Sequence, residues 1–278
     1  MSTNREYDIA IAWRIYPKVS KTPIVFAEDK FGMVKNSLLS FINAAKGLKI
    51  YYYFLLDGCP PEYDQLIATL FKDNYSIAKT DRIGNGATFA KQIEILLEQD
   101  KAEVICFGED DYIYTPGDFG KAFAFIREKG VDFISGYLPM DVFTHPLHAH
   151  KRYTRYSQDR LWLTANSTCL TFMTTVTVLK ETRGLFLTYA RGNNDCAIWL
   201  ILTKTHILNP FAYLKFSGDR INFGILKMAV KYSFKYFFTL RKYQLWMPYP
   251  AICTHLEKGN ESPGTNWIAV SQNVPDAV

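Results

Sequence analysis

Strands and helices alternate along the first part of this chain, and this alternation constrains the fold more than any other feature. Apolar runs rich in strand-forming residues lie at 8–13, 49–56, 75–79 and 103–107. Helical patterns lie between them, and the clearest, at residues 33–47, repeats apolar side chains every three or four positions. Strands that alternate with helices at this spacing predict an α/β fold whose mostly parallel central sheet has helices on both faces.

The pattern becomes mixed in the second part of the chain. Strand-like runs occupy 131–138 and 160–175, and a helix is predicted from Asn194 to Thr203. A chain of 278 residues is long enough for one large α/β domain, and neither an internal repeat nor a Pro/Ser-rich linker divides it. We therefore expect a single domain, residues 1–278, with two functional halves at 1–115 and 116–278.

Composition excludes several protein classes. With 48% hydrophobic and 21% charged residues, the chain has the composition of a globular protein and not of a disordered one. Its five cysteines are scattered without a C-x-x-C spacing, so we expect a reducing compartment without a zinc ribbon or disulfide framework. No run approaches the ~20 apolar residues that a bilayer span needs, and the N-terminus lacks a signal-like segment. The expectation is a cytoplasmic protein, soluble or peripheral on a membrane.

Polar residues follow three of the predicted strands. Asp57 ends the second strand, the loop 84–86 follows the third, and the triplet Glu109, Asp110 and Asp111 follows the fourth. In open parallel sheets, ligands bind where the carboxyl ends of the strands emerge. The sequence therefore predicts a ligand site along this edge.

The acidic triplet suggests a metal ion. Alternate side chains of an extended chain share a side, so Glu109 and Asp111 are expected to point together and Asp110 elsewhere. Two converging carboxylates repel, and a divalent cation between them removes the conflict. Carboxylate oxygens suit Mg²⁺ or Mn²⁺, and a histidine ligand favours Mn²⁺. The alternative is a solvated turn that caps the helix after Pro116.

The order of these motifs resembles that of the GT-A glycosyltransferases, especially the family-2-like enzymes that transfer sugars from nucleoside diphosphates. Five segments carry the resemblance, which covers about residues 8–202: "IAIAWRIYP", "FLLDG", "GNGATFAKQ", "VICFGEDDYIYTP" and "NNDCAIWLIL". Two positions depart from the family pattern, since Glu109 replaces an Asp and Asn194 replaces an acid. Beyond residue 203 the match is weak.

This resemblance implies a GT-A fold, Rossmann-like, with a nucleotide-sugar-binding half at 1–115 and a mixed acceptor-side half that ends in a closing C-terminal segment. It implies a metal-dependent, inverting transfer from a nucleotide-diphosphate sugar to a hydroxyl of a glycan or glycoconjugate. The metal, Mn²⁺ or Mg²⁺, would be bound by Glu109, Asp111 and His255, and Asp195 would be the catalytic base. Donor contacts would come from Arg14, Asp57, Asn85, Lys91 and Asp110.

Some of these residues also have plainer explanations. Asp195 follows two asparagines that suit a helix N-cap, where the helix dipole favours an ionised carboxylate, but acids are common there without any catalytic role. Lys91 lies early in its helix, where the dipole disfavours a cation unless an anion is near. His255 is alternatively a surface histidine. His145, His148 and His150 suggest either a metal site or a loop near the acceptor.

The segment 222–250 is aromatic and basic. Its Lys227, Lys231 and Lys235 are four residues apart and lie on one stripe of a predicted helix. Such a helix suits an anionic membrane surface, and residues 222–246 are therefore a candidate for peripheral membrane contact. The alternative is a helix packed on the sheet with its lysines in water. Nucleic acid is not an expected partner, because the acidic cluster repels phosphate.

Two other functions remain open from the sequence. One is a nucleotidyltransferase that makes sugar nucleotides, but such an enzyme normally has a glycine-rich phosphate loop after its first strand, and "AWRIYPK" contains no glycine. The other is a non-catalytic module that keeps the fold and docks on membranes.

Overall fold

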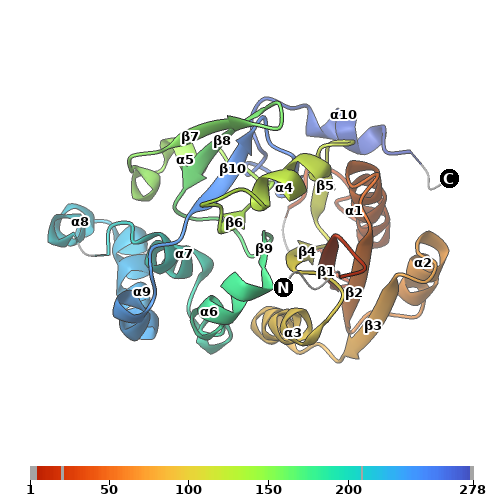
Figure 1. Cartoon of the computed structure of the whole chain (residues 1–278), viewed down its shortest axis with the longest axis horizontal. Coiled ribbons are helices and arrows are strands. Elements are labelled where there is room, and N and C mark those ends of the chain that lie inside the picture. The colour runs from red at the N-terminus through yellow and green to blue at the C-terminus, as the bar shows by residue number, and fades with distance from the viewer. Residues whose placement is uncertain (1–4, 20–21, 208, 276–278) are drawn as a thin grey trace.

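The structure, a computed structural model, describes residues 5–19, 22–207 and 209–275. Within them a nine-stranded sheet has the order β3-β2-β1-β4-β9-β6-β10-β8-β7 (Figure 1). Its strands are β1 (Ile9–Ile15), β2 (Ile50–Asp57), β3 (Tyr75–Thr80), β4 (Val104–Glu109), β6 (Phe133–Ile134), β7 (Thr154–Ser157), β8 (Arg160–Ala165), β9 (Met173–Thr175) and β10 (Leu245–Tyr249). A separate pair is formed by β5 (Tyr112–Tyr114) and β11 (Cys253–His255).

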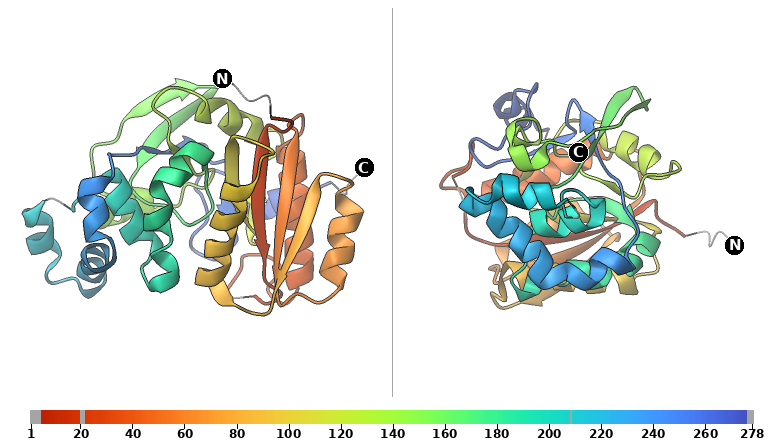
Figure 2. Two further views of the ribbon diagram at one scale, coloured as in Figure 1. Left: turned by 60° about the horizontal axis from the view of Figure 1, so that its bottom comes forward. Right: turned by 90° about the vertical axis from the view of Figure 1, so that its left-hand side faces the viewer.

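Helices cover both faces of this sheet (Figures 1 and 2). The longer ones are α1 (Lys30–Ala44), α2 (Glu62–Leu70), α3 (Gly84–Glu98), α4 (Phe119–Ile126), α6 (Val176–Phe186), α7 (Asp195–Thr203) and α9 (Arg220–Thr239). The shorter ones are α5 (Asp141–Thr144), α8 (Pro210–Phe216), α10 (Trp267–Gln272) and the 3₁₀ turns η1 (Pro146–His148) and η2 (Tyr189–Arg191).

Strand β1 shows why both faces are covered. Its Ile9, Ile11 and Trp13 pack in a cluster with residues of α1, α2 and α4, while Ala10 and Ala12 pack in a second cluster with residues of α3, α6 and α7. Alternate side chains of a strand point to opposite faces, and here all five are fully buried. A strand that is apolar on both sides is stable only between two layers of helices.

The strand directions agree with the sequence-based prediction. Strands β3, β2, β1 and β4 are mutually parallel. Strand β9 is antiparallel to β4 and to β6, and β8 is antiparallel to β10. The predicted parallel sheet and the mixed second half are thus confirmed. The predicted helix at Asn194–Thr203 is also confirmed as α7, which is buried along most of its length between the sheet and α9.

The basic segment differs from the expectation in one respect. Its helix, α9, ends at Thr239, and Leu245–Tyr249 form β10 in the middle of the second half of the sheet. Leu245, Trp246 and Met247 are buried there, so they are not available to a membrane. None of the helices in the described part of the chain is long and apolar enough to cross a bilayer.

Candidate active site

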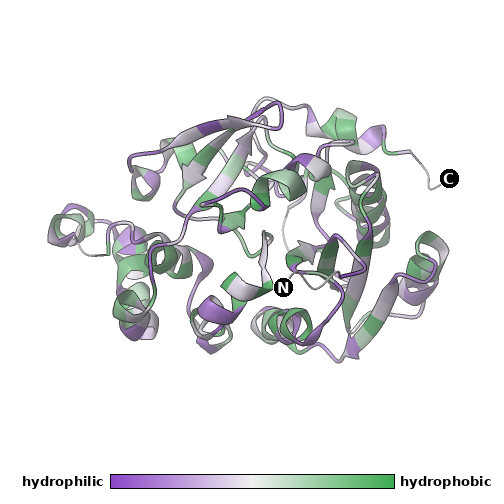
Figure 3. Ribbon diagram, viewed as in Figure 1, coloured by the Kyte–Doolittle hydropathy of each residue, from purple (hydrophilic) through white to green (hydrophobic). Residues whose placement is uncertain are grey.

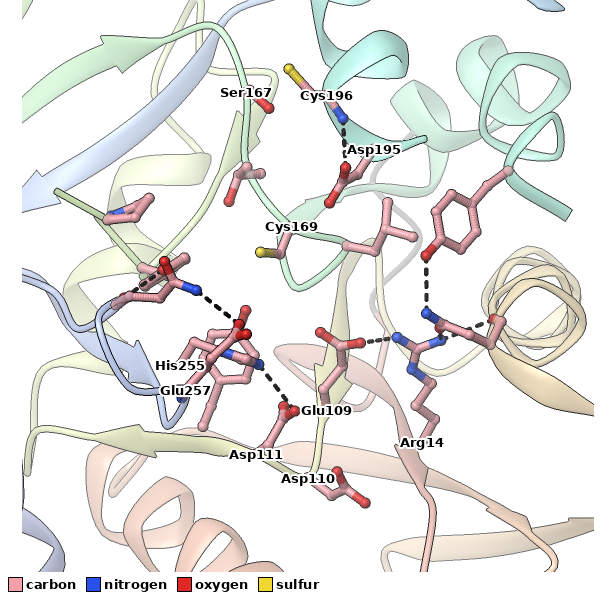
Figure 4. Close-up of a pocket in the computed structure, with 18 of the residues that line it drawn as sticks. Arg14, Glu109, Asp110, Asp111, Ser167, Cys169, Asp195, Cys196, His255 and Glu257 are labelled. Atoms are coloured by element: carbon pink, nitrogen blue, oxygen red, sulfur yellow. Dashed lines mark hydrogen bonds and ion pairs between the residues drawn. The ribbon is translucent and has the colours of Figure 1, made fainter. Parts of the chain in front are cut away.

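A cavity of about 630 Å³ opens at the carboxyl ends of the parallel strands. Its walls come from the ends of β1, β2 and β4, the starts of α3 and α7, and the segments around residues 139–148, 167–170 and 255–260. Both parts of the chain therefore contribute to one cavity, as Figure 4 shows. Of the predicted site residues, eight line it: Arg14, Asp57, Asn85, Glu109, Asp110, Asp111, Asp195 and His255.

Arg14 and Glu109 form an ion pair on one wall. The parallel pairing of β1 with β4 places these two residues side by side. The Arg14 guanidinium donates to the Glu109 carboxylate and to the side-chain and backbone oxygens of Asn85. Glu109 also accepts a hydrogen bond from the Thr171 hydroxyl. Burial lowers the pKa of Arg14, although nearby acids such as Asp111 act in the opposite direction.

Asp110 is directed away from its two neighbours (Figure 4). Its carboxylate accepts hydrogen bonds from the Tyr16 backbone N–H at 2.8 Å and from the Lys30 ammonium at 2.7 Å. Burial raises the pKa of Asp110, and the Lys30 charge opposes this effect. Asp110 thus ties the loop after β1 to the first turn of α1, which is a positioning role.

Asp111 meets His255 from the C-terminal segment. Pairing of β11 with β5 places His255 opposite Tyr112, and the His255 Nε2 lies 3.0 Å from Asp111 Oδ2. The other imidazole nitrogen lies 3.6 Å from Glu257 Oε2. Burial acts to raise the pKa of Asp111, but His255, Lys30 and Arg14 outweigh it and lower that pKa to about 2. Asp111 is therefore a carboxylate at neutral pH.

The fit of these residues to a metal ion is partial. The Asp111 Oδ1 atom is buried and has no hydrogen-bond partner in the part of the chain that the structure describes. An ionised carboxylate oxygen beside an imidazole is a donor pair that suits Mn²⁺. Glu109 lies apart, bound to Arg14 and Thr171. Accordingly, the described residues contain no assembled group of three His, Cys, Asp or Glu side chains for a metal. The metal site therefore stays a prediction, and of its three predicted ligands only Asp111 and His255 contact each other.

Asp57 has a structural role at the cavity wall. Its Oδ1 accepts hydrogen bonds from the Thr80 hydroxyl at 2.9 Å and the Ile83 N–H at 2.8 Å, and its Oδ2 accepts one from the Gly84 N–H at 3.0 Å. The carboxylate therefore fixes the turn between β3 and α3.

Asn85 and Lys91 both lie on α3, but only Asn85 reaches the cavity. Asn85 lies in the first turn, where it accepts from Arg14 and donates to the Tyr189 hydroxyl at 2.9 Å. Lys91 is almost two turns further along, exposed and paired with Glu94 at 2.6 Å. This helix presents Asn85 and Thr88 to the cavity, and Lys91 is not among the lining residues, so its position gives the predicted donor contact no support.

Asp195 enters the cavity from the opposite wall. The Asn194 side chain caps α7 by accepting from the Ala197 N–H at 2.7 Å, as the sequence predicted. Asp195 is the first residue of the helix, and its Oδ1 accepts from the Cys196 N–H at 2.7 Å. Figure 4 shows its carboxylate directed into the cavity, across from Glu109 and Arg14.

Two of the three clustered histidines line the same cavity. They are His145 and His148, whereas His150 lies outside it. The His148 Nδ1 atom is 2.8 Å from Asn166 Oδ1, and its Nε2 atom is 3.6 Å from the Asp141 carboxylate. This loop therefore forms part of the cavity wall, and its predicted proximity to the acceptor stays a prediction.

Sequence reasoning missed several lining or supporting residues. Lys30 neutralises Asp110, and Arg82, Tyr112, Asp141 and Tyr189 line the cavity. Arg82 and Tyr112 directly adjoin motifs that were recognised, so proximity in sequence was an available signal. Lys30, Asp141 and Tyr189 reach the site only through tertiary structure.

Comparisons with known proteins give structural similarity only. No family model matches the chain, and no curated protein matches it by sequence. Residues 1–349 of Staphylococcus aureus TarS align with 82% of this chain and 73% of theirs, at 13% identity and a TM-score of 0.43. The glycosyltransferase GlyE of Streptococcus pneumoniae aligns over 78% and 51%, at 12% identity and a TM-score of 0.38. The galactosyltransferase LgtC, solved with donor and acceptor sugar analogues, aligns over 97% of both chains at 8% identity and a TM-score of 0.48.

Proposed function

We propose that this protein is a glycosyltransferase that moves a sugar from a nucleoside-diphosphate donor to a hydroxyl of a glycan or glycoconjugate, with inversion at the anomeric carbon. One observation carries the proposal. A single cavity holds an arginine–asparagine cluster and an ionised Asp111 on one wall, and a second carboxylate, Asp195, on the other. Such an arrangement provides one set of side chains to bind a charged leaving group and a separate carboxylate to accept a proton from a nucleophile.

The wall with Arg14 suits the diphosphate. Arg14 is buried beside the first turn of α3, and Arg82 lines the cavity next to that turn. Guanidinium groups bind phosphate oxygens through paired hydrogen bonds. Asn85, fixed between Arg14 and Tyr189, presents an amide on the same wall. These groups would bind and orient the donor.

Asp111 and His255 would hold a divalent ion. Mn²⁺ or Mg²⁺ at this position would neutralise the charge that the leaving diphosphate gains. Asp111 is suited to it because its pKa of about 2 keeps it ionised and its Oδ1 lacks a protein partner among the described residues.

Asp195 would act as the general base. Its position in the first turn of α7 favours the ionised carboxylate through the helix dipole. A carboxylate there accepts the proton of an acceptor hydroxyl, whose oxygen then attacks the anomeric carbon while the bond to the diphosphate breaks. Attack from the face opposite the leaving group inverts the configuration.

The first test combines donor binding with turnover. Nucleotide sugars are screened with Mn²⁺ for thermal stabilisation, where a ligand at ~100 times its dissociation constant adds roughly 2.7 kcal/mol. Asp195→Asn should keep donor binding and lower kcat about 100-fold or more. Asp111→Asn should weaken the response to Mn²⁺. Asp100→Asn, at an acid whose side chain is 90% exposed, is the matched control and should resemble the wild type.

Two results would contradict the proposal in different ways. If no nucleotide sugar stabilises the wild type with or without Mn²⁺, the donor class is wrong. If a donor binds but NMR of the product shows retained configuration, the base role of Asp195 is wrong.

A further inference from the structure

Helices α8 and α9 carry an exposed surface of mixed apolar and basic side chains, which we call the α8–α9 face. Figure 1 shows these two helices at the left end of the molecule, and in the right view of Figure 2 they face the viewer. Large apolar side chains with exposed fractions from 60% to 75% lie on it: Phe211, Leu214, Ile221, Phe234 and Phe238. Large exposed apolar side chains gathered on two neighbouring helices suggest an interaction site.

The spacing of residues along α9 explains this surface. Leu226, Ala229, Ser233 and Phe237 are buried toward the body of the protein, where α9 packs on α7. Hydrophobic and hydrophilic residues both appear along the helix in Figure 3. Phe234 and Phe238, one turn apart, contact each other with ring centroids 5.4 Å apart. The helix therefore has one buried side, and its exposed side also carries large apolar side chains.

Three lysines lie among these apolar residues. Lys227, Lys231 and Lys235 are exposed, and each ammonium lies 4.5–4.8 Å from the centroid of a neighbouring aromatic ring. No described carboxylate forms an ion pair with any of the three. Their positive charge is therefore available to an anionic partner.

The charge of the whole chain is concentrated here. Residues 211–242 contain seven Lys or Arg and one acid, Asp219, whereas the whole chain has 32 basic and 27 acidic residues. The rest of the chain thus holds 25 basic and 26 acidic residues and is nearly neutral. Of the seven, Arg241 is held by Asp132 and Glu181 and has a structural role.

We propose that the α8–α9 face docks on the surface of an anionic lipid bilayer, with α9 in the plane of the interface. Aromatic and aliphatic side chains enter the headgroup region, and lysines beside them contact lipid phosphates. A second copy of the chain fits poorly, because a symmetric contact through this face brings like charges together. Nucleic acid leaves the exposed phenylalanines and leucine unexplained.

Docking through this face has a consequence for the cavity, which rests on the proposed function. Ile225 of α9 lines the cavity, and the Asn193 amide donates to Ser233 of α9 at 3.0 Å. Asn193 lies two residues before Asp195. Helix α9, which contacts lipid, therefore supports the segment that leads into α7 and the candidate base Asp195. Because α9 contacts both the bilayer and the cavity, the acceptor hydroxyl would belong to a molecule anchored in the bilayer.

The test is sedimentation of the full chain with vesicles of phosphatidylcholine, with and without phosphatidylglycerol. One variant pair removes charge, Lys231→Gln with Lys235→Gln, and another removes apolar surface, Phe234→Ser with Phe238→Ser. Matched controls lie on other helices or loops: Lys46→Gln with Lys72→Gln, and Ile268→Ser, which is 47% exposed on α10. Circular dichroism checks that each variant is folded.

The wild type should bind only the anionic vesicles, and added salt should weaken binding. Loss of two lysines should weaken it about 30-fold, from roughly 1 kcal/mol per lysine near the surface. The phenylalanine pair should also weaken it, and the controls should not. Equal binding to neutral vesicles, wild-type binding by both α9 variants, or a dimer that the phenylalanine pair dissociates would each overturn the proposal. The vesicle assay contains no sugar donor, so its result does not depend on the proposed function. If the protein binds vesicles but transfers no sugar in a separate activity assay, only the proposed function is contradicted.

Discussion

Three consecutive carboxylates lie at the end of β4, and each has a different partner. Glu109 binds Arg14, Asp110 binds Lys30, and Asp111 binds His255. The partners come from the first strand, the first helix and the C-terminal segment. Neighbouring like charges raise one another's pKa unless such partners compensate. The fold therefore separates the acids by directing each toward its own cation or imidazole.

We expect Arg14→Met to destabilise the protein by about 3–5 kcal/mol, because it leaves the Glu109 carboxylate buried without a counter-charge. The side chains of the pair are only 16% and 15% exposed. Adding Glu109→Gln should recover part of the loss. Urea unfolding of the two single variants and the double variant measures the coupling.

The comparison for this pair is Lys79→Met, which breaks an ion pair whose lysine is 62% exposed. It should cost less than about 1 kcal/mol. A similar cost at both sites would show that burial of the Arg14 pair has no energetic weight.

The sequence predicted the alternation within the triplet but not these partners. Period-two geometry separated Asp110 from Asp111, but Glu109 did not converge on Asp111 and instead binds Arg14. The family resemblance placed His255 with Asp111, and the two are in contact, while their metal role stays a prediction. The local sequence did not indicate that Arg14 would form an ion pair with Glu109, because the two residues meet only through the pairing of β1 with β4. Nor did the local sequence indicate that Lys91 would lie outside the cavity, because packing determines which residues of α3 face the cavity.

At the scale of elements, the Trp13 ring of β1 packs over Gly108 of β4 where the site begins. A Cβ atom on Gly108 would lie 2.7 Å from the Trp13 ring, which is fully buried. Gly108→Ala should therefore cost about 1–3 kcal/mol through overpacking. It should also lower donor binding, because Glu109 is the next residue. Chemical denaturation and nucleotide-sugar titration check the two effects.

Gly120→Ala in α4 is the matched control for Gly108→Ala. No atom would lie within 4 Å of its new Cβ, apart from chain neighbours and the helix's own backbone. A helical alanine should be neutral or stabilising by up to ~1 kcal/mol. If Gly108→Ala is equally harmless, the contact between Gly108 and the Trp13 ring does not restrict this position to glycine.

Helix α4 also gives a pH prediction. Asp118, its N-cap residue, pairs with Arg160 at 2.7 Å. Burial acts to raise the pKa of Asp118, but Lys121, Thr115 and Arg160 lower it overall. A depressed folded-state pKa stabilises the protein above the unfolded pKa of ~3.9, and this stabilisation disappears as the pH falls through the folded value.

We therefore expect wild type to exceed Asp118→Asn in unfolding free energy at pH 6, with the difference shrinking below about pH 4. Denaturation midpoints from pH 6 to pH 3 measure this. A difference that stays constant over that range would assign the effect to lost hydrogen bonding and not to charge.

At the scale of the whole molecule, one sheet runs through both parts of the chain. A single buried cluster joins Ala10 and Phe107 to Trp199, Leu245 and Trp267. The two predicted halves therefore share a core, which the alternating pattern up to residue 109 did not reveal. The strand-like runs predicted at 131–138 and 160–175 contain β6 and β9, but strands of two and three residues give too little periodicity to predict their bounds or their partners in the sheet.

A shared core predicts cooperative unfolding. Circular dichroism and tryptophan fluorescence should report coincident transitions in urea, because separating the halves would expose the common cluster. A variant that retains only Trp13 should report the same midpoint as one that retains only Trp199, after correction for the substitutions. Two separated midpoints would show that residues 1–115 and 116–278 unfold as independent units.

The two walls of the cavity have different origins. Arg14, Glu109 and Asp111 stand at the ends of strands packed between helices, whereas the facing wall comes mainly from connecting segments near residues 139–148 and 189–195. Substitutions in connections cost less folding free energy than substitutions in buried strands. Under the proposed function, the facing wall can diversify while the strand ends stay fixed, so a change of acceptor need not alter the residues that bind the sugar donor.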